Sequence, residues 1–343
     1  MMVSKKTLPI SVLGAGSWGT ALALLLARNG QVTRLWDWNP AHIATLQTQR
    51  VNARYIPGVP FPETLSLYAD LQAAVADVED ILIVVPSHAF PGLVSKLKPL
   101  LKSNKHGKFP RIAWGTKGLD PNSGRFLHQF VAEELGHAVP VAILAGPTFA
   151  TEVAAGLPSA ITLAANNRQF ADDLLERLHN NHFRVYLSTD LIGVQVCGTV
   201  KNVLAVATGI CDSLQLGANA RCALLTRGLA EMTRLGLALG GQLETFLGLA
   251  GVGDLVLTCH NDLSRNRRFG LALGQGLNIE AAVASIGQAV ESIDNVELVH
   301  DLAQKQSVVM PVVEQVYQVL HHGKLPSEAV EALMSRDPAV EVS

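Results

Sequence analysis

The sequence predicts a doubly wound, mostly parallel α/β sheet followed by an all-α C-terminal domain. Three observations support this fold class. Short apolar runs alternate with helical patterns over the first 190 residues, which is typical of parallel strands joined by crossover helices. A glycine-rich turn, Gly14-Ala-Gly16-Ser-Trp-Gly19, follows the first apolar run. After about Leu191 the strand-like runs stop and only helical stripes remain.

The predicted strands are short, apolar or β-branched runs that end at glycine, proline or a charged turn. The first is followed by an Ala/Leu-rich helix over residues 20–29 that stops at Gly30. Buried parallel strands read as nearly continuous apolar runs, and these runs fit that description. The expected strands are residues 10–13, 32–36, 81–85, 111–114, 141–144 and 160–164.

The second half of the chain reads as helical because its apolar residues recur at helical spacing. Val196, Val200 and Val203 begin such a stripe. We expect a dinucleotide-binding domain over residues 1–190, a helical substrate and catalytic domain over 191–335, and a loose tail over 336–343. The expected helices of the second domain are residues 193–210, 223–239, 279–286, 292–304 and 311–321.

Composition narrows the class of protein. A length of 343 residues exceeds one comfortable core, so two domains are expected. A net charge of −2 argues against nucleic acid or an anionic membrane as the main partner. The four cysteines show no C-x-x-C pairing, which favours reduced thiols and a cytoplasmic location. No metal site is expected.

An alternative interpretation of the N-terminal region is a targeting or membrane-spanning segment. Residues 8–27 carry no charge and follow Lys5-Lys6. The same stretch contains Gly14, Gly16 and Gly19, which a strand, a turn and a helix start explain better. No membrane span is therefore predicted.

The glycine spacing predicts a dinucleotide site in a Rossmann-type sheet. Gly14 allows the tight turn, Gly16 lets the backbone approach a pyrophosphate, and Gly19 allows close helix–strand packing. Asp37 closes the second strand, where a carboxylate binds ribose hydroxyls and repels a 2′-phosphate. The alternatives are a glycine-rich turn without a ligand and a surface turn acid at Asp37. Arg34 would partly offset Asp37, unless strand alternation directs it elsewhere.

Polar residues follow two further strands at the edge where ligands bind in open α/β sheets. Lys117 lies between glycines after residues 111–114, and is well placed for an anionic substrate or the cofactor. Gly146-Pro147-Thr148 follows residues 141–144, with a tight turn and a hydroxyl.

The helical half carries a second group of candidates. Lys201 lies at the edge of the apolar stripe, where a partly desolvated ammonium exchanges protons near neutrality. Asp254 is expected to orient Lys201, or to cap a helix. Ser264, Arg265 and Asn266 supply donors suited to a phosphate. The alternatives are a snorkelling lysine and an exposed basic helix start.

Taken together, these motifs make the chain resemble bacterial NAD(P)-dependent glycerol-3-phosphate dehydrogenases over nearly its full length. No single motif is as specific as the combination. The matching segments are residues 14–23, Trp114-Gly-Thr-Lys-Gly118, Gly146-Pro-Thr-Phe-Ala150, Val200-Lys-Asn-Val203, Gly253-Asp-Leu255 and Ser264-Arg-Asn-Arg-Arg-Phe-Gly270.

The resemblance implies roles for individual residues. Lys201 becomes the proton donor and acceptor in hydride transfer between NAD(P)H and dihydroxyacetone phosphate, which supplies sn-glycerol 3-phosphate for phospholipid synthesis. A homodimer is expected from the family. The resemblance places Lys117, Gly146, Thr148, Lys201, Asp254, Ser264, Arg265 and Asn266 around the phosphorylated substrate, and Ser17, Trp18, Tyr55, Lys117, Ala150, Arg265, Ala289 and Glu291 around the cofactor.

One departure from the family bears on cofactor choice. Many relatives carry His or Arg after the second strand, whereas this chain has Asp37-Trp38-Asn39. We therefore expect Asp37 and Trp38 to contribute to cofactor binding, with NADH used at least as well as NADPH.

Two other functions remain open at this stage. A β-hydroxyacid dehydrogenase has a similar layout, but it places an Asn four residues after its lysine, where this chain has Ala205. A non-catalytic NAD(P)-binding sensor explains the glycine turn but not the combination of Lys201, Asp254 and Arg265.

Overall fold

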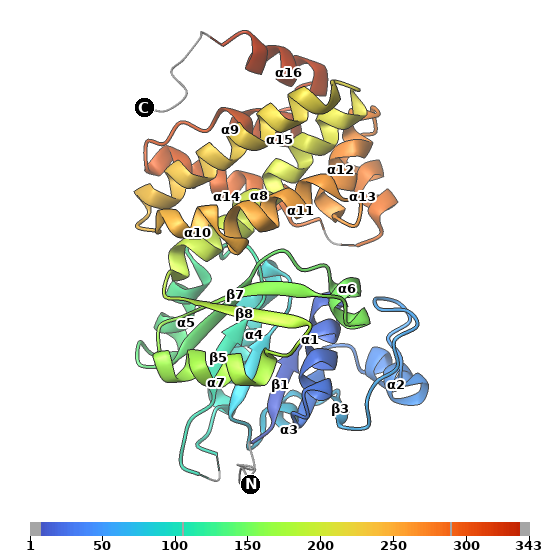
Figure 1. Ribbon diagram of the computed structural model, residues 1–343, viewed down its shortest axis with the longest axis vertical. Coiled ribbons are helices and arrows are strands. Elements are labelled where there is room, and N and C mark those ends of the chain that lie inside the picture. Colours follow the sequence, from blue (N-terminus) through green and yellow to red (C-terminus); the bar gives the residue numbers. More distant parts are fainter. Residues whose placement is uncertain (1–7, 105, 289, 337–343) are drawn as a thin grey trace. The chain divides into compact units, whose positions relative to one another are not determined.

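The computed structural model describes residues 8–104, 106–288 and 290–336 (Figure 1). The chain divides into two compact units, Met1–Val194 and Gln195–Ser343. Unit 1 contains the sheet and unit 2 is helical throughout its described residues, as the sequence predicts.

Unit 1 is built on an eight-stranded sheet in the order β3-β2-β1-β4-β5-β6-β7-β8. All neighbouring strands are parallel except the antiparallel pair β6 and β7. The order reverses between β1 and β4, which creates the switch point where doubly wound sheets bind ligands. The strands are β1 Ile10–Leu13, β2 Thr33–Trp36, β3 Leu65–Tyr68, β4 Asp80–Ile83, β5 Arg111–Trp114, β6 Val141–Ala145, β7 Ser159–Ala165 and β8 Phe183–Ser188.

Helices cover both faces of this sheet. Alternate strand residues such as Ile10 and Val12 belong to a core shared with α1, α6 and α7. Trp114 points to the opposite face, where its ring packs edge-on against Phe90 of α4 at a centroid distance of 5.6 Å. The helices of this unit are α1 Ser17–Arg28, α2 Pro40–Gln49, α3 Leu71–Val75, α4 Phe90–Leu97, α5 Leu127–Leu135, α6 Ala150–Ala155 and α7 Arg168–Leu178.

Two strands, β3 and β8, were not predicted from the sequence. Neither β3 nor β8 is a continuous apolar run, because both lie at sheet edges and expose part of their length. β3 has the sequence LSLY and β8 has FRVYLS, so both alternate rather than form the apolar blocks that the prediction relied on.

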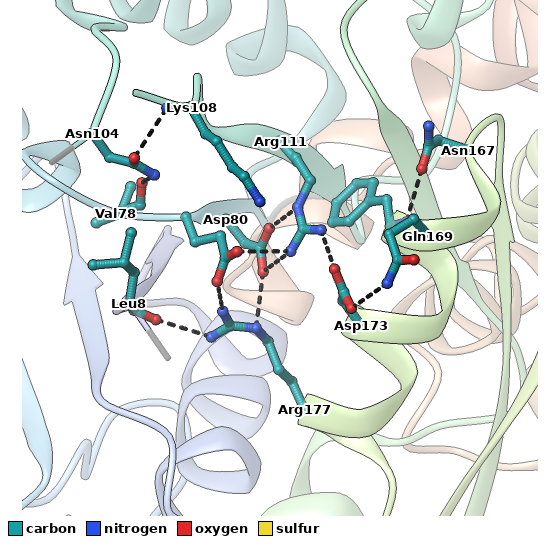
Figure 2. A network of polar contacts seen from close by, with 12 residues as sticks. Leu8, Val78, Asp80, Asn104, Lys108, Arg111, Asn167, Gln169, Asp173 and Arg177 are labelled. Atoms are coloured by element: carbon teal, nitrogen blue, oxygen red, sulfur yellow. Dashed lines mark hydrogen bonds and ion pairs between the residues drawn. The ribbon is translucent and has the colours of Figure 1, made fainter. Parts of the chain in front are cut away.

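A buried ion-pair network connects α7, which lies between β7 and β8 in the chain, to the first residues of β4 and β5 (Figure 2). Asp80, the first residue of β4, lies between two guanidinium groups. Its Oδ1 is 2.7 Å from Arg111 Nε, and its Oδ2 is 2.9 Å from Arg177 Nε. Arg111 also contacts Asp173 of α7 at 2.5 Å. Burial raises the pKa of Asp80, and the two arginines act against this rise. The network lies at the amino ends of β4 and β5, at the opposite edge of the sheet from the glycine turn that follows β1.

Unit 2 is a bundle whose first helix, α8, begins four residues before the boundary between the units. A π-helical turn, Leu249–Gly253, precedes α11. The helices are α8 Leu191–Ser213, α9 Gly217–Ala238, α10 Leu243–Leu247, α11 Asp254–His260, α12 Arg265–Gly274, α13 Ile279–Ile286, α14 Ser292–Lys305, α15 Pro311–His321 and α16 Pro326–Met334.

The uncharged stretch near the N-terminus forms β1 and α1 and is part of the sheet domain. Among the described residues, α8 alone is long and apolar enough to cross a membrane, and 89% of its most apolar window is buried within the protein. Burial of this kind is typical of the core helix of a globular domain.

Candidate active site

The glycine turn of unit 1 has the geometry of a dinucleotide cradle. Gly14 has a φ of +118°, and a Cβ there would lie 2.3 Å from the Val84 carbonyl oxygen. A Cβ on Gly19 would lie 1.9 Å from the Gly14 carbonyl oxygen. A Cβ on Gly16, in contrast, would meet no atom within 4 Å. Gly14 and Gly19 are therefore required by packing, whereas Gly16 borders open space that a pyrophosphate would occupy.

Two side chains from outside the motif hold this turn. Asp37 Oδ2 accepts a hydrogen bond from the Ala15 amide at 3.0 Å, and its Oδ1 accepts one from the Asn39 amide at 3.0 Å. Asn52 Nδ2 donates to the Ala15 carbonyl at 2.9 Å and to Thr20 Oγ1 at 2.8 Å. Asp37 is only 9% exposed, so it is a buried, oriented carboxylate rather than a surface turn acid. Sequence reasoning missed Asn52, which has no local motif.

The surroundings of Asp37 offer little positive charge. Arg34 donates from Nη1 to the carbonyls of Ala73 and Ala76 at 3.1 and 2.6 Å, near the end of α3. The Arg34 guanidinium is thus bound to backbone carbonyls near α3 and not to Asp37, in agreement with the expectation that strand alternation could direct it away. Trp38, next to Asp37, exposes 77% of its surface. Tyr55 is half-buried, and the Arg54 guanidinium lies 5.2 Å from its ring centroid.

The remaining cofactor and substrate candidates of unit 1 lie in loops at the carboxyl ends of β5 and β6. A Cβ on Gly115 would lie 2.6 Å from Trp18 Nε1, so this loop lies against the glycine turn. Lys117 follows in the same loop and is half-buried. After β6, Thr148 Oγ1 donates to the Gly146 carbonyl at 3.3 Å, and Ala150 opens α6.

Lys201 lies at the centre of a buried polar cluster in unit 2. It is 2% exposed, so it is more deeply buried than its position at the edge of the apolar stripe suggested. Its Nζ is 2.5 Å from Asp254 Oδ2 and donates to Thr258 Oγ1 at 3.0 Å. Thr258 in turn donates to Asp254 Oδ1 at 3.3 Å. The three groups form a closed triangle in which the carboxylate compensates the ammonium charge.

Thr258 was missed as a partner of Lys201, although a signal for it exists in the sequence. Asp254 and Thr258 are four residues apart on α11, so a helix places them on one face. Cys259 follows, and burial raises the pKa of its thiol to about 12, with the charge of Lys201 among the opposing effects. Burial therefore favours the protonated form of this thiol.

The phosphate candidates open α12. Ser264 Oγ accepts a hydrogen bond from the Arg267 amide at 3.2 Å and thereby caps the helix. Arg265 is partly exposed, and among the described residues no carboxylate pairs with its guanidinium. Asn266 is buried, and its Oδ1 accepts from the Ser292 amide at 3.2 Å at the start of α14.

The start of α14 links these helices to that of Lys201. Asn202 Nδ2 donates to Glu291 Oε2 at 3.4 Å, which connects α8 to the residue preceding α14. The other expected cofactor contact in this segment, Ala289, lies outside the described residues.

The predicted site residues thus fall into two groups, one in each unit. Unit 1 contains most of the cofactor candidates together with the substrate candidates Lys117, Gly146 and Thr148. Unit 2 contains the acid–base and phosphate candidates, and its Arg265 and Glu291 are also expected at the cofactor. Those of unit 1 are Gly14, Gly16, Ser17, Trp18, Gly19, Asp37, Trp38, Tyr55, Lys117, Gly146, Thr148 and Ala150, and those described in unit 2 are Lys201, Asp254, Ser264, Arg265, Asn266 and Glu291.

Comparison with known proteins identifies close relatives over almost the whole chain. Residues 9–171 match the family model of the NAD-dependent glycerol-3-phosphate dehydrogenase N-terminus, and residues 190–331 match that of its C-terminus. A glycerol-3-phosphate dehydrogenase [NAD(P)+] of Coxiella burnetii is 56% identical over 97% of this chain and 98% of its own. That of Haemophilus influenzae is 53% identical over 98% of each chain.

Solved structures agree with these matches. The crystal structure of glycerol-3-phosphate dehydrogenase from Coxiella burnetii has a TM-score of 0.92 at 55% identity, covering 96% of this chain and 99% of that one. The enzyme from Saccharomyces cerevisiae has a TM-score of 0.81 at 27% identity, covering 96% of this chain and 99% of that one. D-mandelate dehydrogenase, at 14% identity and a TM-score of 0.63, shares the fold alone.

Proposed function

Because the chain belongs to the NAD-dependent glycerol-3-phosphate dehydrogenase family, we propose how its residues perform that reaction. The protein is an NAD(P)-dependent oxidoreductase that interconverts dihydroxyacetone phosphate and sn-glycerol 3-phosphate. The observation that carries the residue assignment is the buried triangle of Lys201, Asp254 and Thr258.

The glycine turn of unit 1 fits a dinucleotide. Gly16 borders open space at the start of α1, whose amide groups favour the negative charge of a pyrophosphate. Ser17, Trp18, Asp37, Trp38, Tyr55 and Ala150 lie in the same unit as further cofactor contacts. When bound, the nicotinamide supplies the hydride for C2 of dihydroxyacetone phosphate.

Lys201 acts as the proton donor in reduction and as the acceptor in oxidation. Negative charge develops on the C2 oxygen as the carbonyl is reduced, and the Lys201 ammonium stabilises this charge before it transfers a proton from Nζ. Asp254 and Thr258 fix the direction of Nζ and keep a buried ammonium from being uncompensated.

The protein recognises its substrate mainly through the phosphate group of that substrate. Arg265, without a carboxylate partner among the described residues, is suited to bidentate phosphate binding, with Ser264 and Asn266 beside it on α12. Lys117, Gly146 and Thr148 of unit 1 complete the expected set. Holding the phosphate orients the remote carbonyl, so binding energy contributes to catalysis.

Other features of the function are proposals that rest on the family. The enzyme supplies glycerol 3-phosphate for phospholipid synthesis in the cytoplasm, and it works as a homodimer. Light scattering after gel filtration tests the dimer, because the chain mass is 36.6 kDa and a dimer has about twice that value.

The test of the residue assignment compares wild type with Lys201→Ala. We expect the variant to lose ~10²–10⁴-fold in kcat for NADH oxidation by dihydroxyacetone phosphate, the usual contribution of general acid–base catalysis. The substrates to compare are dihydroxyacetone phosphate, a β-keto acid and unphosphorylated dihydroxyacetone. Near-full turnover by the variant would remove Lys201 from the mechanism.

A further inference from the structure

Helices α8 and α12 of unit 2 touch backbone to backbone. A Cβ on Gly270 of α12 would lie 2.2 Å from the Val206 carbonyl oxygen of α8. A Cβ on Gly209 would lie 2.2 Å from the Arg267 carbonyl oxygen, and one on Gly274 would lie 2.6 Å from Ser213 Cβ. Glycine at these three positions permits an approach that any side chain would prevent.

This contact relates the position of Lys201 in the middle of α8 to that of Arg265 at the start of α12. Val206 meets Gly270 and Ser213 meets Gly274, so the two helices advance in the same direction. Lys201 precedes Val206 by five residues, and Arg265 precedes Gly270 by five residues. Each interval spans about 7.5 Å of helix. The acid–base lysine and the phosphate arginine are therefore set by the same helix pair.

Two arginines in the first turn of α12 have opposite surroundings. Arg265 has no carboxylate partner among the described residues. Arg267 is 7% exposed and binds two carboxylates: its Nη1 is 2.5 Å from Asp212 Oδ2, and its Nε is 2.9 Å from Asp262 Oδ1. Asp212 lies near the end of α8, and Asp262 lies in the loop that leads into α12. Arg267 thus ties the start of α12 to the helix of Lys201.

We propose that Arg267 is a positioning residue for the reaction, which fixes the first turn of α12 against α8 so that Arg265 holds the substrate phosphate at the correct distance from Lys201. The inference rests on the proposed role of Arg265. The Arg267 guanidinium is neutralised and buried, so it does not itself bind the phosphate. Its planar fork reaches two carboxylates at once, which an ammonium on a flexible stem does not do with the same geometry.

The fold should survive loss of this side chain. Asp212 keeps Arg221 of α9 as a partner at 3.0 Å, and Asp262 exposes 68% of its side chain to solvent. Arg267→Met therefore leaves no buried carboxylate without a counter-charge. The variant isolates the positioning effect from a general loss of stability.

A double-mutant cycle between Arg265→Ala and Arg267→Met tests the inference. We expect Arg267→Met to lower kcat/KM for dihydroxyacetone phosphate by ~10²-fold, as displacement of a positioned group by about 1 Å does. The pH profile of kcat should keep its shape, because Lys201, Asp254 and Thr258 are untouched. The double variant should be no worse than Arg265→Ala alone, because Arg267 acts through Arg265.

Controls and contrary outcomes separate this inference from the proposed function. The control variant Arg168→Met removes an exposed i,i+4 pair in unit 1 and should retain wild-type activity. A damaged Arg265→Ala beside a normal Arg267→Met, or fully multiplicative effects in the cycle, would overturn the inference alone. A fully active Arg265→Ala would overturn the proposed phosphate role and the inference with it. If circular dichroism shows Arg267→Met unfolded, Asp212→Asn carries the same cycle under the same criteria.

Discussion

At the scale of single residues, the glycine turn shows how glycines of one motif serve two different roles. Gly19 is needed because a Cβ would overlap the Gly14 carbonyl oxygen at 1.9 Å, whereas Gly16 has open space around its Cα. The first requirement belongs to folding and the second to the ligand. Mutation of Gly16 and mutation of Gly19 should therefore produce different phenotypes.

We expect Gly16→Val to fold like wild type but to bind NADH poorly, because the added side chain projects into space reserved for the pyrophosphate. Gly19→Val should instead lose stability or fail to fold, because the overlap is with backbone. Thermal unfolding and NADH fluorescence titration measure the two effects. A Gly16→Val protein with normal NADH affinity would contradict this division of roles.

Asp37 is a second residue whose environment predicts a phenotype. Its carboxylate is held by the Ala15 and Asn39 amides, and Arg34 is engaged with the carbonyls near the end of α3. A 2′-phosphate near Asp37 would meet like charge, worth on the order of 1–4 kcal/mol at intermediate dielectric. NADH should therefore be used at least as well as NADPH.

The measurement is kcat/KM for both cofactors in wild type and in a variant with Asp37→Gly, Trp38→His and Asn39→Arg. The variant should shift toward NADPH tenfold or more. Because Asp37 also holds the Ala15 amide, NADH affinity of the variant must be measured beside it. A wild-type enzyme that strongly favours NADPH would refute this account of Asp37.

At the scale of elements, the first amide groups of α15 donate hydrogen bonds to a buried carboxylate of α9. Glu231 of α9 is 2% exposed, and its two oxygens accept from the Val312 and Val313 amides at 2.8 and 3.2 Å. Burial raises the pKa of Glu231 to about 7, against the favourable effects of these amides and of Arg234 and Arg336. The first turn of α15 is thus capped by a group that titrates near neutrality.

The sign of the pH effect follows from this raised pKa. Between the ordinary value of 4.5 and about 7, the folded state binds more protons than the unfolded state, so the contribution of Glu231 to stability falls as pH rises. The full change is about 3 kcal/mol. Urea unfolding from pH 5 to 8 should show Glu231→Gln gaining stability relative to wild type as pH increases. Parallel stability curves for the two proteins would show that Glu231 does not titrate in this window.

How far the sequence predicts the elements depends on what stabilises each one. Strands such as Ile10–Leu13 and Arg111–Trp114 were located because burial on both faces makes them continuous apolar runs. The edge strands β3 and β8 lack that signal.

Lys201 and Asp254 were predicted from motifs, and the structure pairs them at 2.5 Å. Asn52 and Glu231 were not, because no local motif marks either residue and their partners lie 32 or more residues away in the chain.

At the scale of the whole molecule, the glycine turn and the proposed acid–base lysine belong to two different compact units. Unit 1 carries the glycine turn and unit 2 carries Lys201. A change at Lys201 in unit 2 should therefore leave the glycine turn of unit 1 largely intact. The increase in Tm that NADH produces, measured in variants of each unit, therefore tests where the cofactor binds.

We expect Lys201→Ala to retain the increase in Tm that NADH gives to wild type. A ligand at 100 times its Kd stabilises the folded state by about 2.7 kcal/mol, whatever the fate of the catalytic step. Gly16→Val, in the other unit, should lose the increase. Absence of the increase in Lys201→Ala would mean that this lysine contributes to cofactor binding.

The buried thiol of Cys259, which follows Thr258 on α11, has a consequence for resistance to oxidants. Peroxides and electrophiles attack the thiolate form of cysteine, and burial keeps Cys259 protonated with a pKa of about 12. Cys222, in contrast, is exposed on α9. Oxidants and alkylating agents should reach Cys222 first and spare Cys259, which is fully buried beside Thr258. We therefore expect activity to persist after an oxidant treatment that modifies Cys222, which an activity assay of the treated protein measures.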